Sequence, residues 1–245
     1  MAKLEAYDKT LDYSYAPGIF PATECLKNAK KRCMRLLVSS NGLQSEGVQA
    51  LEKAAQEADI RVEVADRALE RISKKENCFA AAVFSKFSDT LAGDKPHVVL
   101  HHPSDCGNVG TILRTALGFG MEDVALIRPC VDLFDPRVVR ASMGSMFSLR
   151  LRVYDDFARY RADYPAHALY PFMLDGSCSL PEALAEPVPE RYALVFGNEG
   201  SGLPGEFAGM GQPVRIPSND RIDSLNLAVA AAIGIYGFTQ RHGKE

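Results

Sequence analysis

The chain has 245 residues, 47% of them hydrophobic and 24% charged, a composition typical of a globular protein that buries a sizeable core. Its net charge of −3 does not favour a nucleic-acid partner, although a local basic patch binds phosphate whatever the total charge. There is no membrane-spanning apolar run, no secretory signal and no C-x-x-C pair among the six cysteines. We therefore expect a cytoplasmic protein with reduced thiols and no membrane partner.

The N-terminal part of the sequence predicts a small α/β unit. Apolar residues at helical spacing predict a helix over 44–58, and the alternation in 60–64 predicts a strand. A helix over 65–74 and a strand over 79–84 follow, and Gly, Asp and Pro residues mark 89–96 as a linker. Two stretches are rich in basic residues, and charge alone does not distinguish a phosphate-binding patch from a solvated face: Lys27, Lys30, Lys31, Arg32 and Arg35, then Arg137, Arg140, Arg150 and Arg152.

From residue 97 onward the pattern changes to short apolar strands separated by helices. Continuous apolar strands that alternate with helices predict a parallel sheet covered on both faces. The predicted strands are 98–100, 124–127, 168–174, 192–196 and 214–216, and the main predicted helices are 108–119 and 224–240. We therefore predict two domains, 1–92 and 93–245.

Three loops at the ends of predicted strands combine glycine with polar residues, and ligands of parallel sheets bind beyond such strand ends. The first loop follows the strand 98–100, and in it Asn108 is suited to cap a helix that begins at Val109. Arg114 lies in this otherwise apolar helix, so it must reach the surface or find a partner. Taken alone, such an arginine is more often a structural salt-bridge partner.

The second loop, 196–204, follows a fully apolar strand. Gly200, Gly202 and Gly205 give a literal G-x-G-x-x-G, the pattern of a dinucleotide-binding turn. Pro204 and the later glycines leave room for only a short helix before the next strand, which is too little for a full strand–helix–strand crossover. The glycines therefore predict a tight loop whose backbone approaches a ligand or another chain.

The third loop, 216–226, leads into an alanine-rich helix that predicts close packing. Ser224 or Asp223 fits the N-cap position of that helix. By itself, this loop favours an ordinary capped helix in a protein core over a ligand site.

Taken together, the three loops resemble the signature motifs of the SpoU (TrmH-like) branch of the SPOUT RNA methyltransferases, in the same order and spacing. One such motif is weak evidence, whereas three in register are strong. The first motif is similar to 107–116 and the second to 194–203. The third is similar to 216–217 together with 224–232, and the family's intervening segment is similar to 139–145.

The resemblance covers residues 93–241 closely and implies an α/β fold with a trefoil-knotted parallel sheet. The knot rests wholly on the resemblance, since knots are very rare among folds. The resemblance also implies a homodimer and an S-adenosylmethionine cofactor bound in a bent conformation among the knot loops. The N-terminal unit is more loosely similar to the ribosomal-protein-like RNA-binding domain that precedes the catalytic domain in many members.

The same resemblance assigns the site residues. Main-chain groups of Gly197, Ile216 and Leu225 are expected to hold the adenosyl moiety, with Phe196 and Asn226 also in the cofactor site. The residues that match the polar active-site positions of the family are Asn108, Arg114, Glu199, Ser224 and Asn226.

Two positions depart from the family pattern. The pair Leu227-Ala228 stands where many members have Val-Ser, which removes no matched catalytic side chain. His101 and His102 precede the first motif, where an acidic or apolar residue is more usual. With Asp105 and Cys106 nearby a metal site is conceivable, but no complete ligand set is evident and we expect no metal.

The implied function is methyl transfer from S-adenosylmethionine to a ribose 2′-hydroxyl of structured RNA. Ribosomal RNA is favoured over transfer RNA because the extra N-terminal domain adds contacts with a structured target. A guanidinium is normally fully protonated, so we favour Arg114 as the holder of a phosphate and stabiliser of developing negative charge rather than as a base. Asn108 would orient the arginine or the ribose, and Glu199 would pair with a cation or shape a dimer-built site. The alternatives are a non-catalytic RNA-binding protein on the same fold, a base-directed RNA methyltransferase and, weakened by the short crossover, a nucleotide-dependent oxidoreductase.

Overall fold

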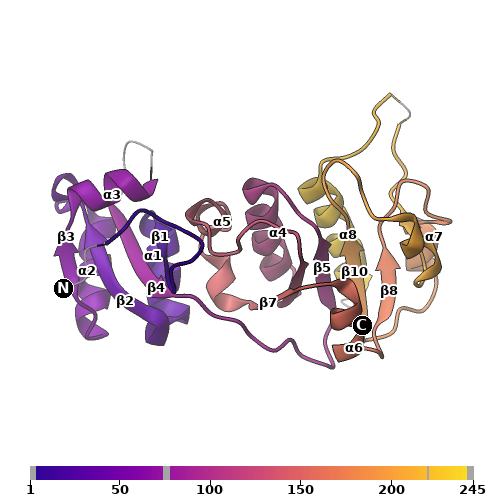
Figure 1. The fold of residues 1–245 in the computed structure, drawn as a ribbon, viewed down its shortest axis with the longest axis horizontal. Helices are drawn as coiled ribbons and strands as arrows, with labels where there is room; N and C mark the ends of the chain where they lie inside the picture. Colours follow the sequence, from indigo (N-terminus) through magenta and orange to yellow (C-terminus); the bar gives the residue numbers. More distant parts are fainter. Residues whose placement is uncertain (1–3, 74–77, 220, 242–245) are drawn as a thin grey trace. The chain divides into compact units, whose positions relative to one another are not determined.

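The computed structural model describes residues 4–73, 78–219 and 221–241. The chain divides into two compact units, an N-terminal unit of Met1–Phe87 with Asp132–Ser148 and a C-terminal unit of Ser88–Val131 with Leu149–Glu245. Figure 1 shows the elements of each unit. Among the described residues, no helix has both the length and the apolar character needed to span a membrane.

The N-terminal unit contains a four-stranded sheet in the order β1-β4-β2-β3, with β4 antiparallel to both of its neighbours. The predicted helices and strands between residues 44 and 85 are confirmed, whereas the elements before them were not predicted. In chain order the elements are β1 (Tyr13–Pro17), α1 (Ile19–Asn28), β2 (Cys33–Val38), α2 (Glu46–Glu57), β3 (Val62–Val64), α3 (Asp66–Ser73) and β4 (Ala80–Ser85).

Local chemistry accounts for α2. The hydroxyl of Ser45 accepts a hydrogen bond from the Val48 N–H at 3.3 Å, which satisfies one of the unpaired donors at the helix start. Val48, Leu51 and Ala55 recur at helical spacing and are all buried, so the helix covers the sheet with its apolar face.

The segment Asp132–Ser148, with helix α5 (Pro136–Ala141), packs within the N-terminal unit. The hydroxyl of Ser14 donates a hydrogen bond to the carbonyl of Phe134. A Cβ on Gly144 would lie 2.7 Å from the Cβ of Glu24, so the two backbones approach closely at this point. The predicted division into domains 1–92 and 93–245 is contiguous in sequence, whereas this packing joins a later segment to the first unit.

The C-terminal unit is built on a five-stranded sheet in the order β7-β6-β5-β10-β8, in which every pairing is parallel. The prediction of an α/β fold with a parallel sheet is confirmed. The strands are β5 (His97–His101), β6 (Asp123–Ile127), β7 (Arg150–Tyr154), β8 (Ala168–Pro171) and β10 (Tyr192–Phe196).

Some strands of this unit differ from the prediction. The edge strand β7 was not predicted because Arg150 and Arg152 interrupt its apolar pattern. Arg150 pairs with the buried Asp123 on the neighbouring strand, with N–O distances of 2.7 and 2.6 Å. The predicted strand at 214–216 exists as β11 (Val214–Arg215), but it pairs with β9 (Cys178–Ser179) in a separate two-stranded sheet.

Both faces of the five-stranded sheet are covered. On one face, Val99, Ile127 and Val195 pack in a core with aromatic residues of α6 (Phe157–Asp163) and of the short 3-10 helix Gly205–Gly209. Helix α8 (Leu227–Arg241) packs on β10 and against α4 (Cys106–Gly118), as Figure 1 shows. This double cover explains why the inner positions of the central strands, such as 98–100 and 124–127, are apolar.

Buried histidines at the amino end of the sheet make hydrogen bonds to the main chain of the residues that precede β5. His97 Nε2 lies 2.8 Å from the carbonyl of Ala92, and its Nδ1 lies 3.0 Å from the hydroxyl of Tyr160. His167 stacks on His97 with ring centroids 4.2 Å apart. Burial lowers the pKa of His97 to about 4 and also lowers the pKa of His167. Both rings are therefore neutral near pH 7.

Candidate cofactor and active site

Helix α4 carries the first predicted motif and begins earlier than expected. Its N-cap is Asp105, whose carboxylate accepts a hydrogen bond of 2.7 Å from the Asn108 N–H. The prediction that Asn108 caps a helix starting at Val109 was therefore wrong. Since Asp105 already satisfies the helix start, the side chain of Asn108 is available for a different bond.

Glu199, in the second motif, holds the start of α4. Its carboxylate accepts hydrogen bonds from the N–H and hydroxyl of Ser104 at 2.9 and 2.6 Å and from the Asp105 N–H at 3.0 Å. The amide of Asn108 donates to the same carboxylate at 3.2 Å. Burial alone would raise the pKa of Glu199, but the hydrogen bonds led by Ser104 outweigh it and lower the pKa to about 2. Glu199 is therefore a fixed anion, anchored beside the helix N-terminus.

Helix α8 carries the third motif, and its cap also differs from the prediction. The side-chain oxygen of Asn226 accepts from the N–H groups of Ala228 and Val229 at 2.9 and 3.3 Å. The prediction of Ser224 or Asp223 as N-cap was therefore wrong, because the helix begins at Leu227 and those side chains lie too far upstream. The amide nitrogen of Asn226 donates a 3.0 Å hydrogen bond to the side-chain oxygen of Asn108.

These bonds form one continuous chain from Glu199 through Asn108 to Asn226. Each motif contributes one side chain, so the structure brings together three of the five predicted polar site residues. A connected polar network of this kind fixes the geometry of its members. The three loops therefore form a single polar site at the carboxyl ends of β5 and β10.

The second motif folds into a tight loop that the side chain of Asn198 stabilises with hydrogen bonds. Its side-chain oxygen accepts from the N–H of Gly200 at 2.9 Å, and its amide donates to the carbonyl of His102 at 2.8 Å. The backbones of Asn198 and Gly202 exchange hydrogen bonds of 3.1 and 3.0 Å. A Cβ on Gly197 would lie 2.2 Å from the carbonyl carbon of Gly202, so only glycine fits at 197.

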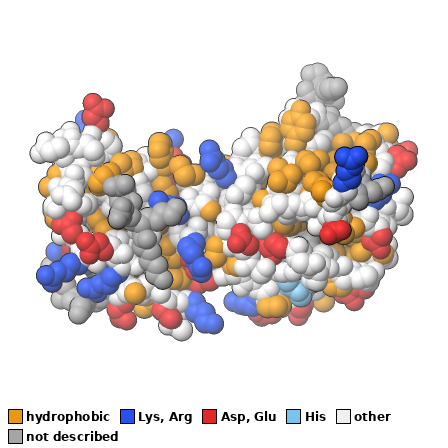
Figure 2. Space-filling model, turned by 90° about the horizontal axis from the view of Figure 1, so that it is seen from above, with side chains coloured by type: hydrophobic (Ala, Val, Ile, Leu, Met, Phe, Trp, Pro, Cys, Tyr) orange, Lys and Arg blue, Asp and Glu red, His pale blue; other side chains and the backbone are white. Residues whose placement is uncertain are grey.

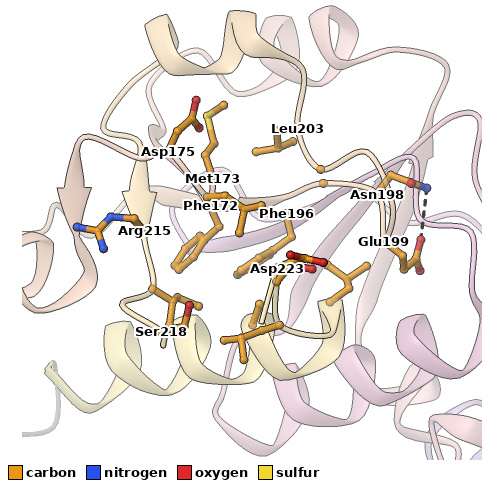
Figure 3. A pocket seen from close by; sticks show the side chains of 18 of the residues that line it. Phe172, Met173, Asp175, Phe196, Asn198, Glu199, Leu203, Arg215, Ser218 and Asp223 are labelled. Atoms are coloured by element: carbon orange, nitrogen blue, oxygen red, sulfur yellow. Dashed lines mark hydrogen bonds between the residues drawn. The ribbon is translucent and has the colours of Figure 1, made fainter. Parts of the chain in front are cut away.

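Beside this loop lies a cavity of about 590 Å³, shown in Figure 3. Phe172 and Phe196 stack in it with ring centroids 4.5 Å apart. Gly234 of α8 lets this ring pair approach the helix, since a Cβ there would meet Phe172 at 2.6 Å. The predicted site residues that line the cavity are Phe196, Gly197, Glu199, Ile216, Ser224 and Leu225.

Three predicted residues lie outside the cavity lining. Asn108 and Asn226 belong to the adjoining polar chain. Arg114 is exposed on α4 and makes no hydrogen bond or ion pair within residues 4–73, 78–219 and 221–241. Arg114 therefore takes no part in the hydrogen-bonded chain of Glu199, Asn108 and Asn226.

The loop after β8 supplies lining residues that the sequence analysis did not identify. Phe172, Met173 and Asp175 follow the end of β8 and border the cavity. Because β8 is the parallel neighbour of β10, its carboxyl end opens onto the same edge of the sheet. The predicted strand at 168–174 was the available signal, since its end had the same expected location as the three motif loops.

The cavity fits an adenosyl group. Its volume lies within the range usual for small-molecule sites, and the stacked pair Phe172 and Phe196 offers an apolar wall for a flat ring. The main chains of Ile216 and Leu225 make no backbone hydrogen bond with another described residue. Their polar groups are therefore available to a ligand.

The two histidines before the first motif form a stacked pair. The rings of His101 and His102 lie 3.7 Å apart, and His101 also contacts Phe207. Burial and the neighbouring His102 lower the pKa of His101 to about 4. The described part of the chain contains no group of three His, Cys, Asp or Glu residues placed to hold a metal ion.

The chain is similar to known proteins in sequence and in fold. The family model described as SpoU rRNA Methylase family matches residues 95–236. A 23S rRNA (adenosine(1067)-2′-O)-methyltransferase of Streptomyces laurentii is 34% identical over 64% of this chain and 58% of its own length. A TrmH-family protein of Porphyromonas gingivalis is 29% identical, with a TM-score of 0.74 over 94% of this chain and 90% of its own.

The fold alone is shared with the SpoU methyltransferase AviRb of Streptomyces viridochromogenes, solved with its cofactor AdoMet. That protein is 21% identical, with a TM-score of 0.80 over 96% of this chain and 92% of its own. The chain spans somewhat more than half the length of the curated relatives it matches. The three motifs, their arrangement around one cavity and the family match agree, and the chain belongs to the SpoU rRNA Methylase family.

Proposed function

We propose that the protein is an S-adenosylmethionine-dependent methyltransferase that modifies a ribose 2′-hydroxyl of ribosomal RNA in the cytoplasm. The observation that carries this proposal is the hydrogen-bonded chain Glu199–Asn108–Asn226 at the mouth of a cavity suited to an adenosyl group. Family membership supports the chemistry, and a relative named as a 23S rRNA 2′-O-methyltransferase supports the substrate class.

The cofactor would be held by residues already in place. The rings of Phe172 and Phe196 would pack on the adenine, and the main chains of Gly197, Ile216 and Leu225 would bond its polar edge. When bound, S-adenosylmethionine supplies a methyl group on a positively charged sulfur. The cavity walls would exclude water from that methyl group and align it with the incoming hydroxyl, and alignment supplies much of the rate.

Arg114 would act on the RNA rather than on the cofactor. Its guanidinium carries a positive charge and is exposed, so it can bind a phosphate beside the target ribose. A fixed positive charge there also stabilises the negative charge that develops on the attacking oxygen as its proton leaves. Asn108, held between Glu199 and Asn226, would orient the ribose. None of these roles requires a metal.

A homodimer would complete the site. Arg114 lies six positions after Asn108, which sets the two side chains roughly 120° apart around the axis of α4, so they point to different sides of the helix. Helix α8 carries no charged residue from Leu227 to Phe238, yet Val229 and Tyr236 are 48% and 54% exposed. Phe119, the residue after the end of α4, is 38% exposed and contacts Tyr236 with ring centroids 5.6 Å apart. A second copy covering this surface would bring its Arg114 to the first copy's cavity.

Figure 2 shows hydrophobic side chains gathered on the surface of the C-terminal unit, which is the kind of surface that marks an association site. Sedimentation would test the dimer. A concentration-independent monomer would contradict it, whereas a dimer lost on substitution Tyr236→Glu would support it.

The remaining proposals concern the fold and the domain roles. We propose that 93–245 forms a trefoil-knotted catalytic domain, on the strength of the family membership and the motif order. We also propose that 1–92 is a ribosomal-protein-like domain that binds RNA. Exposed Lys27, Lys30 and Lys31 support this, whereas Arg35 is engaged with Glu63 at 3.5 Å.

The experiment that tests the function is transfer of labelled methyl from S-adenosylmethionine to unmodified ribosomal RNA and transfer RNA, both free and in ribosomal subunits, followed by digestion to nucleosides. A labelled 2′-O-methylnucleoside is expected. Label on a base would keep methyl transfer but overturn the ribose assignment. Cofactor binding with no label on any RNA would favour the non-catalytic alternative.

A further inference from the structure

The charges around the cavity are unequal. Among its described lining residues, Asp175, Glu199 and Asp223 carry carboxylates, and Arg215 carries the opposing positive charge. Figure 3 shows the Arg215 side chain pointing away from the cavity, and its charge acts on Glu182 outside it. The cavity is therefore electronegative.

The three carboxylates differ in how they face the cavity. Glu199 is saturated by hydrogen bonds from the start of α4. Asp175 points away from the stacked rings in Figure 3. The carboxylate of Asp223 lies among the side chains at the centre of the same view, and it makes no hydrogen bond or ion pair with any other residue that the structure describes. Asp223 is therefore the carboxylate whose charge is left for a ligand.

The proposed reaction changes the charge of the cofactor by one unit. The S–CH₃ bond breaks, an O–CH₃ bond forms, and the hydroxyl proton leaves to solvent. The positively charged sulfur becomes a neutral thioether, while the adenosyl, ammonium and carboxylate groups remain the same. A fixed negative charge near the sulfur therefore favours the substrate form over the product form, and partly enclosed walls strengthen such a field.

We propose that Asp223 is a specificity-determining residue that makes the cavity prefer S-adenosylmethionine to its product S-adenosylhomocysteine. This inference rests on the proposed function and deepens it. The carboxylate stabilises the cationic sulfur, and the loss of that charge on methyl transfer loosens the product. Asp223 thereby reduces product inhibition without touching the RNA.

A competing role predicts a different result. A carboxylate that accepted hydrogen bonds from the ribose hydroxyls of the cofactor would bind substrate and product alike, since both contain the same ribose. The two roles are therefore separated by the ratio of the two dissociation constants rather than by either constant alone.

The test is calorimetric titration of the full chain, wild-type and Asp223→Asn, with S-adenosylmethionine and with S-adenosylhomocysteine. Because Asp223 is exposed, solvent and salt screen its charge. Removing that charge is expected to weaken the binding of S-adenosylmethionine by roughly three- to fivefold. S-adenosylhomocysteine should bind Asp223→Asn as it binds the wild type. Added salt should shrink the wild-type preference and leave that of the variant unchanged.

Asp175→Asn is the matched control, since it removes a charge from the same cavity at a side chain that points away from the stacked rings. In this control, the ratio of the dissociation constants of S-adenosylhomocysteine and S-adenosylmethionine should stay near the wild-type value. Equal weakening of both ligands in Asp223→Asn, or an unchanged ratio, would overturn the inference. A wild-type chain that binds neither ligand would instead overturn the proposed function itself.

Discussion

Asn226 donates a 3.0 Å hydrogen bond to the side-chain oxygen of Asn108, across 118 residues of sequence. In each of these two side-chain amides, both the oxygen and the nitrogen make a hydrogen bond. The oxygen of Asn226 caps α8, and the nitrogen of Asn108 donates to Glu199. Neither side chain can rotate by half a turn without exchanging a donor for an acceptor, so the network fixes one orientation of each.

Substitution at Asn226 separates capping from orientation. Asn226→Asp keeps the oxygen that caps α8 but loses the donor to Asn108, so we expect near-native stability with methyl transfer reduced at least tenfold. Asn226→Ala loses both and should also lower the free energy of unfolding by about 1 kcal/mol. Thermal unfolding and single-turnover transfer would measure the two effects. Full activity of Asn226→Asp would show that the bond to Asn108 is not needed.

The tight loop of the second motif makes Gly197 irreplaceable. In Gly197→Ala the new Cβ would meet backbone at 2.2 Å, so the loop must shift, at a cost of about 1–3 kcal/mol. We expect cofactor binding at least tenfold weaker. Gly200→Ala is the matched control in the same loop, because its Cβ would lie 3.6 Å from the nearest side-chain atom, an ordinary contact. Equal cofactor affinity in both variants, measured by calorimetry, would refute this reading.

Glu199 should make stability depend on pH in the acid range. Its pKa is lowered to about 2 in the folded chain, against an ordinary value near 4.5, so the unfolded chain takes up its proton first as pH falls. The stabilisation is fully present above about pH 4.5 and is lost as pH falls towards 2. The difference in Tm between wild type and Glu199→Gln should therefore narrow over that window. A difference that stays constant from pH 6 to pH 3 would contradict the assignment.

His97 should make stability depend on pH in a higher range than Glu199 does. The unfolded side chain takes up a proton below about pH 6.5 and the folded one only below about pH 4, so stability falls as pH drops between these values. His97→Gln cannot protonate, and its amide can still donate to the carbonyl of Ala92. We expect a lower Tm at pH 7 and a shallower fall between pH 6.5 and 4, with His101 and His167, whose pKa values are also lowered by burial, responsible for the residual slope. A slope equal to that of the wild type would exclude His97 as the source.

Arg114 should matter for transfer and not for the cofactor. It lies outside the cavity lining, so Arg114→Ala should bind S-adenosylmethionine like the wild type. Loss of a charge that stabilises the attacking oxygen is expected to slow transfer by about 100-fold or more. Arg114→Lys, which keeps the charge but not the planar fork, should recover part of the rate. Normal turnover of Arg114→Ala would refute the role.

Local patterns in the sequence predicted many elements, and they failed where neighbours along or across the chain decide the outcome. Strand β7 was not predicted because Arg150 looks like a surface residue until Asp123 of the adjacent strand is known to pair with it. Both predicted caps were displaced because several cap-forming residues stand in a row at each helix start. Which of them caps depends on where the preceding loop places the first turn, as Asp105 and Asn226 show.

The sequence by itself determined the alternation of apolar strands and helices, and it determined the three glycine-containing motifs, because both depend on residues close together along the chain. The tertiary structure decided which side chains of those motifs meet. Glu199 and Asn108 lie 91 residues apart, and spacing along the chain carries no information about the distance between them in space. Only the parallel pairing of β5 with β10 brings their strand ends to one edge and turns separate loops into one site.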